Sequence, residues 1–135
     1  MARLTLIIAD DDDDLRDWLA VVLAPLDAEI HQAANGATLW RLIATGAPAD
    51  LVITDVRMPA PDGLEVLARV RASGSSVPFL VVSAFADEAV RTAAARHGAE
   101  VLAKPFTGKQ LLARVRQLLE RAAATPVAEP DVLAP

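Results

Sequence analysis

The stretch "LTLIIADDDDDLRDWLAVVLAP", residues 4–25, changes from an apolar run to five aspartates and then to a helical pattern. Residues 4–8 are mostly apolar at consecutive positions, which is typical of a strand buried on both faces of a parallel sheet. After the aspartates, one apolar face recurs at helical spacing until Pro25: Leu15, Trp18, Leu19, Val22 and Leu23. This order predicts one β–α unit of an α/β fold.

The same alternation of strand-like and helical segments continues along the chain. Further strands are predicted at 28–33, 51–54, 79–83 and 100–103. Helices are predicted between and after them at 37–45, 63–72, 87–97 and 107–122. Five consecutive β–α units predict a doubly wound, five-stranded parallel sheet with right-handed crossovers and helices on both faces.

The length of 135 residues fits one domain. We expect this domain to span residues 1–121. Residues 122–135, "AAATPVAEPDVLAP", contain three prolines and lack apolar periodicity, which is typical of a disordered tail or linker.

Composition and charge narrow the classes of function. The net charge of −5 and the lack of a Lys/Arg cluster argue against direct binding of nucleic acid by this chain. The chain has no cysteine, so thiolate metal sites and cysteine nucleophiles are excluded. No apolar segment approaches the roughly 20 residues of a membrane span, and the apolar start is too short for a signal peptide. We therefore expect a cytoplasmic protein without a membrane segment.

Polar side chains gather where the predicted strands end. Asp10 and Asp11 end the first strand, Asp55 the third, Ser83 the fourth and Lys104 the fifth. Ligands of open parallel sheets bind at this carboxyl edge. Each residue taken alone has an ordinary structural explanation, since Asp55 could cap a loop, Ser83 could cap the helix at 87–97 and Lys104 could be a surface lysine. Their joint placement at one edge favours a site.

This set of side chains requires a cation. Two carboxylates about 5 Å apart repel by on the order of 3 kcal/mol at an effective dielectric of about 20. Asp10, Asp11 and Asp55 carry −3 and Lys104 carries +1, so a net charge of −2 remains for one divalent ion. Oxygen ligands without His or Cys favour Mg²⁺, or Mn²⁺, and Mg²⁺ accepts phosphate oxygens. The pattern predicts phosphoryl transfer with Asp55 as nucleophile, and with Lys104 and Ser83 holding phosphoryl oxygens.

Four motifs resemble those of the response regulator receiver domain of two-component signal transduction, in the CheY-like superfamily. They are "LIIADDD", "LVITDVRMPAPDGLEVL", "FLVVSA" and "VLAKPF", and the resemblance covers residues 3–121. It implies a flavodoxin-like fold with strand order 2-1-3-4-5. It also implies a phosphoprotein that acts in a phosphorelay and is switched for partner binding or homodimerisation through the surface formed by 87–97, 100–103 and 107–122.

The resemblance assigns a role to each site residue. Asp10 and Asp11 would be the metal-binding acidic pair, Asp55 the phosphoacceptor and metal ligand, and the Arg57 backbone carbonyl a further metal ligand. Ser83 would be the switch hydroxyl and Lys104 the phosphate-contacting lysine, followed by a cis bond to Pro105. The phosphodonor would be a sensor histidine kinase or phosphotransfer protein, and the domain would phosphorylate and dephosphorylate itself without being a conventional enzyme.

The sequence departs from this family at Val101, where receivers often carry Tyr or Phe, so this position provides no aromatic ring for a rotamer switch. Phe85 and Arg57 each lie two residues after a site residue and would flank the site entrance. Trp18 is expected to pack at the edge of the core, with kinase docking as the alternative.

Two other functions stay open on the sequence alone. One is a small phosphatase of the haloacid dehalogenase type, in which Asp10 would be the nucleophile. The other is a docking module that works without phosphorylation. Of the five aspartates, Asp10 and Asp11 would face the metal, and Asp12 or Asp13 would cap the first helix.

Overall fold

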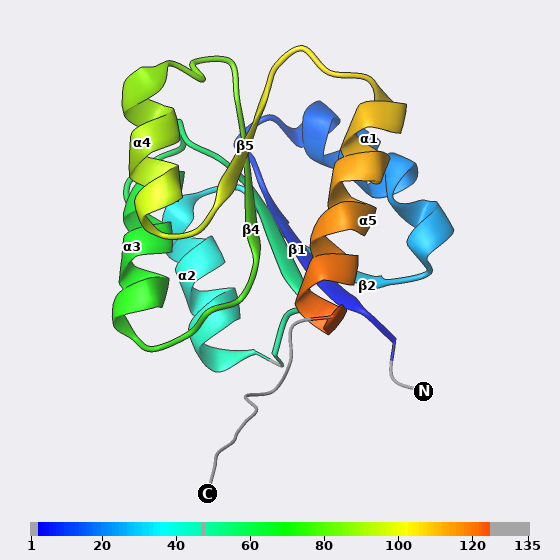
Figure 1. The fold of residues 1–135 in the computed structure, drawn as a ribbon, viewed down its shortest axis with the longest axis horizontal. Coiled ribbons are helices and arrows are strands. Elements are labelled where there is room, and N and C mark those ends of the chain that lie inside the picture. Colours follow the sequence, from blue (N-terminus) through cyan, green and yellow to red (C-terminus); the bar gives the residue numbers. More distant parts are fainter. Residues whose placement is uncertain (1–2, 47, 125–135) are drawn as a thin grey trace, which may run out of the picture.

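The computed structural model describes residues 3–46 and 48–124, which alternate between strands and helices (Figure 1). The strands are β1 (Thr5–Ala9), β2 (Glu29–Ala33), β3 (Leu51–Asp55), β4 (Phe79–Ser83) and β5 (Glu100–Ala103). The helices are α1 (Asp13–Val22), α2 (Gly36–Thr45), α3 (Gly63–Ala72), α4 (Glu88–Arg96) and α5 (Gly108–Ala124), and a 3-10 turn, η1 (Ala24–Leu26), follows α1. All ten predicted elements are confirmed, with small differences at their ends.

The five strands form one parallel sheet in the order β2-β1-β3-β4-β5. β1 is an inner strand, with β2 on one side of it and β3, β4 and β5 following on the other side. This reversal of direction falls between β1 and β3, where Ile7 pairs with Val52. The doubly wound flavodoxin-like topology predicted from the sequence is confirmed, and its switch point lies where ligands bind in such sheets.

Helices cover both faces of the sheet, with α1 and α5 on one face and α2, α3 and α4 on the other (Figure 1). Successive side chains of a strand point to opposite faces, so Ile8 packs toward Leu19 and Leu111 while Ile7 packs toward the core of the other face. Both cores are almost entirely aliphatic. This arrangement explains why the strands read as continuous apolar runs.

Short polar side chains start the helices. Asp12 caps α1 by accepting a hydrogen bond from the Leu15 N–H, which settles the choice between Asp12 and Asp13. Asn35 caps α2, and Asp62 forms a reciprocal capping box with Glu65 at α3. Asp87, rather than Ser83, caps α4, so the alternative explanation for Ser83 as a helix cap is wrong.

The last helix is slightly longer than expected. Helix α5 ends at Ala124, two residues past the helix end expected at residue 122. The expected tail lies, from residue 125 onward, outside the described residues. Within residues 3–46 and 48–124, no helix has both the length and the apolar character that crossing a membrane requires.

Candidate functional site

The carboxyl edge of the sheet brings together the residues that the sequence singled out. Asp10 directly follows β1, Asp55 and Ser83 are the last residues of β3 and β4, and Lys104 follows β5. Because all strands are parallel, these positions lie at the same edge. Asp10, Asp55 and Ser83 are buried, whereas Asp11 is exposed.

Three carboxylates form a cluster at this edge. One oxygen each of Asp10, Asp11 and Asp55 lie within 4.8 Å of one another. Two of the three carboxylates are buried and the third is exposed, so the negative charge of the cluster lies at the boundary between the core and the solvent. Oxygen donors at this spacing, with no His or Cys among them, suit a hard divalent cation such as Mg²⁺. The cluster could therefore hold a metal ion, as the sequence predicted.

Lys104 bridges two of these carboxylates. Its Nζ lies 3.2 Å from Oδ2 of Asp10 and 3.0 Å from Oδ2 of Asp55. The sequence placed Lys104 at the correct edge but did not predict this double ion pair. One ammonium against three carboxylates leaves a net charge of −2, which explains how the cluster retains attraction for a divalent cation.

Burial and the ion pair between Asp10 and Lys104 have opposite effects on the pKa of each of these two residues. Burial is the main cause that raises the pKa of Asp10 above its ordinary value of 3.8, and the Asp12 N–H and Lys104 only partly offset it. Burial also acts to lower the pKa of Lys104, but the hydrogen bond and charge of Asp55, with those of Asp10, raise it above 10.5. Lys104 is therefore a fixed cation at neutral pH.

The backbone around Asp55 holds its carboxylate in place. Its Oδ1 accepts a hydrogen bond from the Val56 N–H at 2.7 Å, while Oδ2 faces Lys104. The Thr54 hydroxyl donates to the Asp55 carbonyl at 2.8 Å. Gly63 packs directly against that carbonyl, where an added Cβ would overlap the oxygen. The nucleophile candidate thus sits on a tightly packed strand end.

Arg16 holds the backbone at Asp10 in place, a contact that was not predicted from the sequence. Arg16 of α1 donates from Nη1 to the Asp10 carbonyl at 2.7 Å, and from Nε to the Gln32 side chain at 3.2 Å. Oδ1 of Asp10 accepts from the Asp12 N–H at 2.9 Å. A basic residue one helical turn after the N-cap was the available signal, because such a side chain can reach back to the strand end.

Ser83 is buried at the end of β4, and its Oγ accepts a hydrogen bond from the Phe85 N–H at 3.0 Å. Because the hydroxyl acts as acceptor in this bond, its proton stays available for another acceptor. Two residues on, the Phe85 ring lies under the Arg57 guanidinium, with 3.6 Å between Cζ and the ring centroid. The sequence placed both residues at the site entrance but did not predict that they contact each other.

Aromatic side chains also flank the Lys104 side of the site. A pocket of about 360 Å³ is lined by Leu15, Trp18, Lys104, Pro105 and Phe106. Trp18 lies against Phe106 with their ring centroids 5.9 Å apart, and it stays 38% exposed. The predicted cis bond between Lys104 and Pro105 is present, and a second one joins Ala60 and Pro61.

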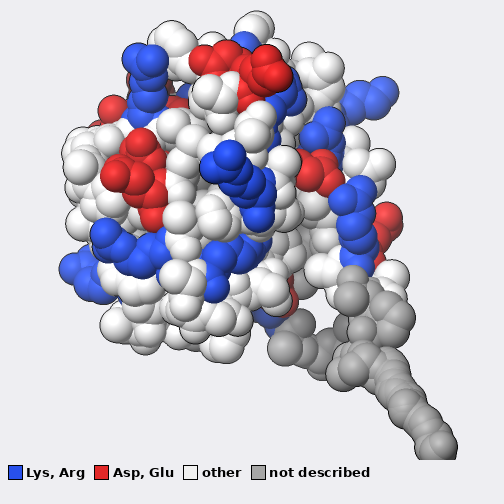
Figure 2. Space-filling model, turned by 60° about the vertical axis from the view of Figure 1, so that its left-hand side comes forward, with Lys and Arg blue, Asp and Glu red and all other residues white. Residues whose placement is uncertain are grey.

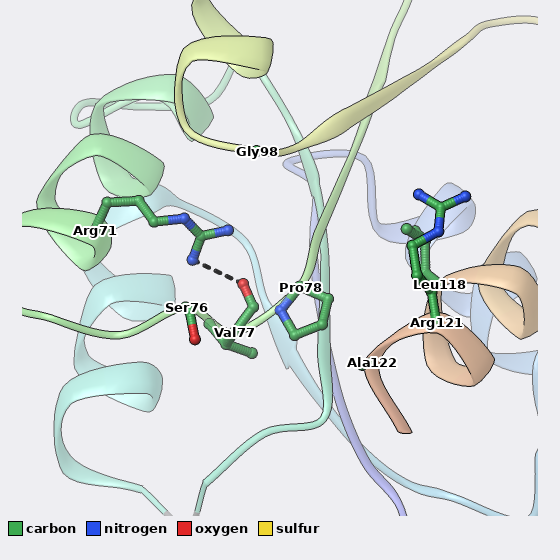
Figure 3. A pocket seen from close by; sticks show the side chains of 8 residues that line it. All are labelled: Arg71, Ser76, Val77, Pro78, Gly98, Leu118, Arg121 and Ala122. Carbon is green, nitrogen blue, oxygen red and sulfur yellow. Dashed lines mark hydrogen bonds between the residues drawn. The ribbon is translucent and has the colours of Figure 1, made fainter. Parts of the chain in front are cut away.

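Another pocket, of about 510 Å³, lies at the opposite edge of the sheet (Figure 3). The Arg71 side chain reaches toward it from α3, and its guanidinium donates to the carbonyls of Ser75, Val77 and His97. These bonds connect α3 to the segments that precede β4 and β5. Burial lowers the pKa of Arg71. The Arg71 cation therefore has a structural role, and this pocket is separate from the acidic cluster.

Comparison with known proteins agrees with this geometry. Residues 6–116 match the family model described as the response regulator receiver domain, so the chain belongs to this family. It is 38% identical over 120 residues to the DNA-binding transcriptional regulator NtrC of Azospirillum brasilense, covering 88% of this chain and 25% of that protein. It is also 38% identical over 127 residues to the response regulator MprA of Mycobacterium sp. (strain KMS), covering 93% of this chain and 54% of that protein.

The chain thus spans about half, or less, of the length of these two relatives. Among solved structures, the receiver domain of a Francisella response regulator aligns with a TM-score of 0.81 at 25% identity, covering 89% of this chain and 99% of that one. A CheY-like receiver domain protein of Methanospirillum hungatei aligns with a TM-score of 0.86 over 93% of this chain and 100% of its own, at 20% identity, which speaks for the fold alone. The expected family and fold are both confirmed.

Proposed function

We propose that Asp55 accepts a phosphoryl group from a phosphohistidine on a sensor histidine kinase or phosphotransfer protein, with Mg²⁺ bound beside it. The observation that carries this proposal is the position of Lys104, whose ammonium lies 3.0 Å from Oδ2 of Asp55. A phosphoryl group attached to Asp55 would bring its negative oxygens to this cation. Phosphoryl transfer depends mainly on such positioning and charge neutralisation.

The donor set supports a metal ion in this role. The carboxylates of Asp10, Asp11 and Asp55 and the backbone carbonyl of Arg57 would hold Mg²⁺, and Mn²⁺ would be accepted by the same oxygen ligands. When bound, the ion supplies positive charge to the phosphoryl oxygens. The remaining charge of −2 at the site is the physical reason for its affinity.

The transfer step uses side chains of this chain. A carboxylate oxygen of Asp55 attacks the phosphorus atom, the P–N bond breaks, and its electron pair leaves with the imidazole of the donor. The new P–O bond makes an acyl phosphate on Asp55. Lys104 then pairs with one phosphoryl oxygen, and the Ser83 hydroxyl donates its free proton to another. In dephosphorylation, water attacks phosphorus and the P–O bond breaks, which regenerates the Asp55 carboxylate and releases phosphate.

The same contacts offer a route to an output surface. Ser83 ends β4 and Lys104 follows β5, so movement of either side chain acts on neighbouring α4, β5 and α5. We propose that these three elements form the surface that changes its affinity for a partner or a second copy of the chain. Val101, partly buried on β5 beside Val81, would take part by shifting rather than by rotating an aromatic ring.

We propose that this surface does not bind nucleic acid directly. The net charge of the chain is −5. On the face that Figure 2 shows, Lys and Arg side chains are separated by acidic and uncharged areas and do not join into one basic patch. A continuous basic patch is the usual electrostatic footprint of a nucleic-acid surface.

Intact-mass measurement tests the phosphoacceptor role. The chain is incubated with acetyl phosphate or phosphoramidate and Mg²⁺, and we expect the mass of one added phosphoryl group. Asp55→Ala should abolish this adduct, and chelation of Mg²⁺ should prevent it. If Asp10→Ala abolishes the adduct and Asp55→Ala does not, the chain works like a phosphatase of the haloacid dehalogenase type.

Beryllofluoride separates the proposal from a docking module that works without phosphorylation. We expect Mg²⁺-dependent binding of beryllofluoride to the wild type and none to Asp55→Ala. Size-exclusion chromatography with and without beryllofluoride then reports homodimerisation. Absence of Mg²⁺-dependent beryllofluoride binding in the folded wild type would favour the docking module.

A further inference from the structure

The segment Ala33–Gly36 joins β2 to α2 and carries no side chain suited to catalysis. Its backbone is nevertheless hydrogen-bonded both to Asp10 and to the loop that follows Asp55. The Ala33 carbonyl accepts a hydrogen bond from the Asp10 N–H at 3.0 Å. Three residues later, the Gly36 N–H donates to the Pro59 carbonyl at 3.3 Å. One short segment therefore links the strand end that bears Asp10 to the loop that follows Asp55.

The contact between Gly36 and this loop leaves no room for a side chain. A Cβ added at Gly36 would overlap the carbonyl oxygen of Pro61 and would also approach the Pro61 ring at 3.1 Å from Cγ. Gly36 does not have a positive φ, so its backbone conformation is not the reason for glycine here. Close approach of α2 to the 56–61 loop is the feature that requires glycine.

The α2 side of this contact is held firmly. Asn35 caps the helix by accepting from the Thr38 N–H at 2.8 Å, and Leu39 is fully buried in the core. In the loop, Met58 is buried, but Arg57, Pro59 and Ala60 are exposed. If the two parts were forced apart, the more exposed loop would move and the packed helix end would stay.

We propose that Gly36 is a positioning residue for the metal site, which it serves by holding the 56–61 loop against the start of α2. This inference rests on the proposed function, because the loop directly follows Asp55 and contains the Arg57 carbonyl. Displacement of the loop would shift the Arg57 carbonyl away from the carboxylates of Asp10 and Asp11. Residues that orient metal ligands from behind typically change metal affinity about 10- to 100-fold when mutated.

The test replaces Gly36 by alanine and measures Mg²⁺ binding by calorimetry. We expect Gly36→Ala to raise the Mg²⁺ dissociation constant about tenfold and to shift the amide NMR signals of Val56, Arg57 and Met58 in the metal-free chain. The matched control is Gly98→Ala, at the turn before β5. Gly98 has φ +70° and open space around it, so this change destabilises the fold by backbone strain alone. Its Mg²⁺ dissociation constant should equal that of the wild type.

A second variant covers the case in which Gly36→Ala does not fold. Asn35→Ala removes the cap of α2 without adding bulk, and we expect a smaller rise in the dissociation constant with the same loop amides shifted. A folded Gly36→Ala chain with wild-type Mg²⁺ affinity and unshifted loop signals overturns the inference. Failure of the wild type to bind Mg²⁺ overturns the proposed function instead, and the metal-free loop signals still report whether Gly36 positions the loop.

Discussion

Nζ of Lys104 lies 3.0 Å from Oδ2 of Asp55, although 49 residues separate the two in the sequence. They lie at the ends of two strands that are not neighbours, because β4 lies between β3 and β5. The Lys104 side chain thus reaches across the end of β4, where Ser83 sits, to the acidic cluster. The Lys104 ammonium thus compensates part of the charge of the three carboxylates.

Removal of the Lys104 ammonium should weaken the fold in the absence of Mg²⁺. Lys104→Ala leaves the buried Asp10 and Asp55 carboxylates without their cation, and we expect a loss of about 1–3 kcal/mol in the free energy of unfolding. Urea denaturation in chelator measures it. The exposed Lys109 provides the control, since Lys109→Ala should change the free energy of unfolding by less than about 0.5 kcal/mol. Equal stability of the two variants would contradict a role for the ion pair.

Mg²⁺ should stabilise the wild-type chain by mass action. At a Mg²⁺ concentration of about ten times the dissociation constant, the expected gain is about 1.4 kcal/mol. Asp11→Asn should abolish this gain while leaving the metal-free stability nearly unchanged, because Asp11 is exposed. Thermal unfolding with and without Mg²⁺ gives both values. A wild-type melting temperature that does not respond to millimolar Mg²⁺ would count against the assigned metal ligands.

The raised pKa of Asp10 predicts a specific pH dependence without metal. Between the unfolded value of 3.8 and the higher folded pKa, the folded state binds more protons than the unfolded state, so Asp10 makes the fold less stable as pH rises. Asp10→Asn removes this cost and keeps an oxygen for the Asp12 N–H. We therefore expect Asp10→Asn to be more stable than the wild type near neutral pH, with the difference shrinking as pH falls through this window.

Urea denaturation in chelator across that pH range measures the difference. Asp11→Asn is the matched control, because it removes one carboxylate of the same cluster at an exposed position. A stability advantage of Asp10→Asn that grows toward acidic pH would contradict burial as the main cause of the raised pKa.

Loss of the contact between Arg57 and Phe85 should shorten the lifetime of the acyl phosphate, provided that Asp55 is phosphorylated as proposed. The Arg57 guanidinium lies 3.6 Å from the Phe85 ring centroid, and we expect this contact to limit the access of water to Asp55. Loss of a contact worth about 1 kcal/mol corresponds to roughly fivefold faster hydrolysis. We expect Phe85→Ala to show this increase, measured as phosphate release after the donor is removed.

Two further variants test the cause of that effect. Arg57→Ala should act in the same direction, and the double variant should add little to either single change, because both remove the same contact. Val21→Ala, at an exposed apolar position on α1, is the control and should leave hydrolysis unchanged. Independent, additive effects of the two single changes would show that the residues act separately.

Much of the fold and site could be predicted from the sequence because the signals are local. Consecutive apolar residues mark a strand buried on both faces, and helical spacing marks each covering helix. Parallel strands place their carboxyl ends at one edge, so Asp10, Asp55, Ser83 and Lys104 could be assigned to a common edge without coordinates. The cis bond between Lys104 and Pro105 was predicted from the family resemblance and is present in the structure.

Contacts between distant segments were decided only by the tertiary structure. The sequence could not choose Asp12 over Asp13 as the cap, because either one has a suitable side chain. It placed Arg57 and Phe85 at the entrance but held no sign of their contact. The sequence also could not predict the contacts of segment Ala33–Gly36, because hydrogen bonds of backbone carbonyls and amides do not depend on residue type. By itself the sequence determined which groups stand at the sheet edge, and packing of the chain decided which of them touch.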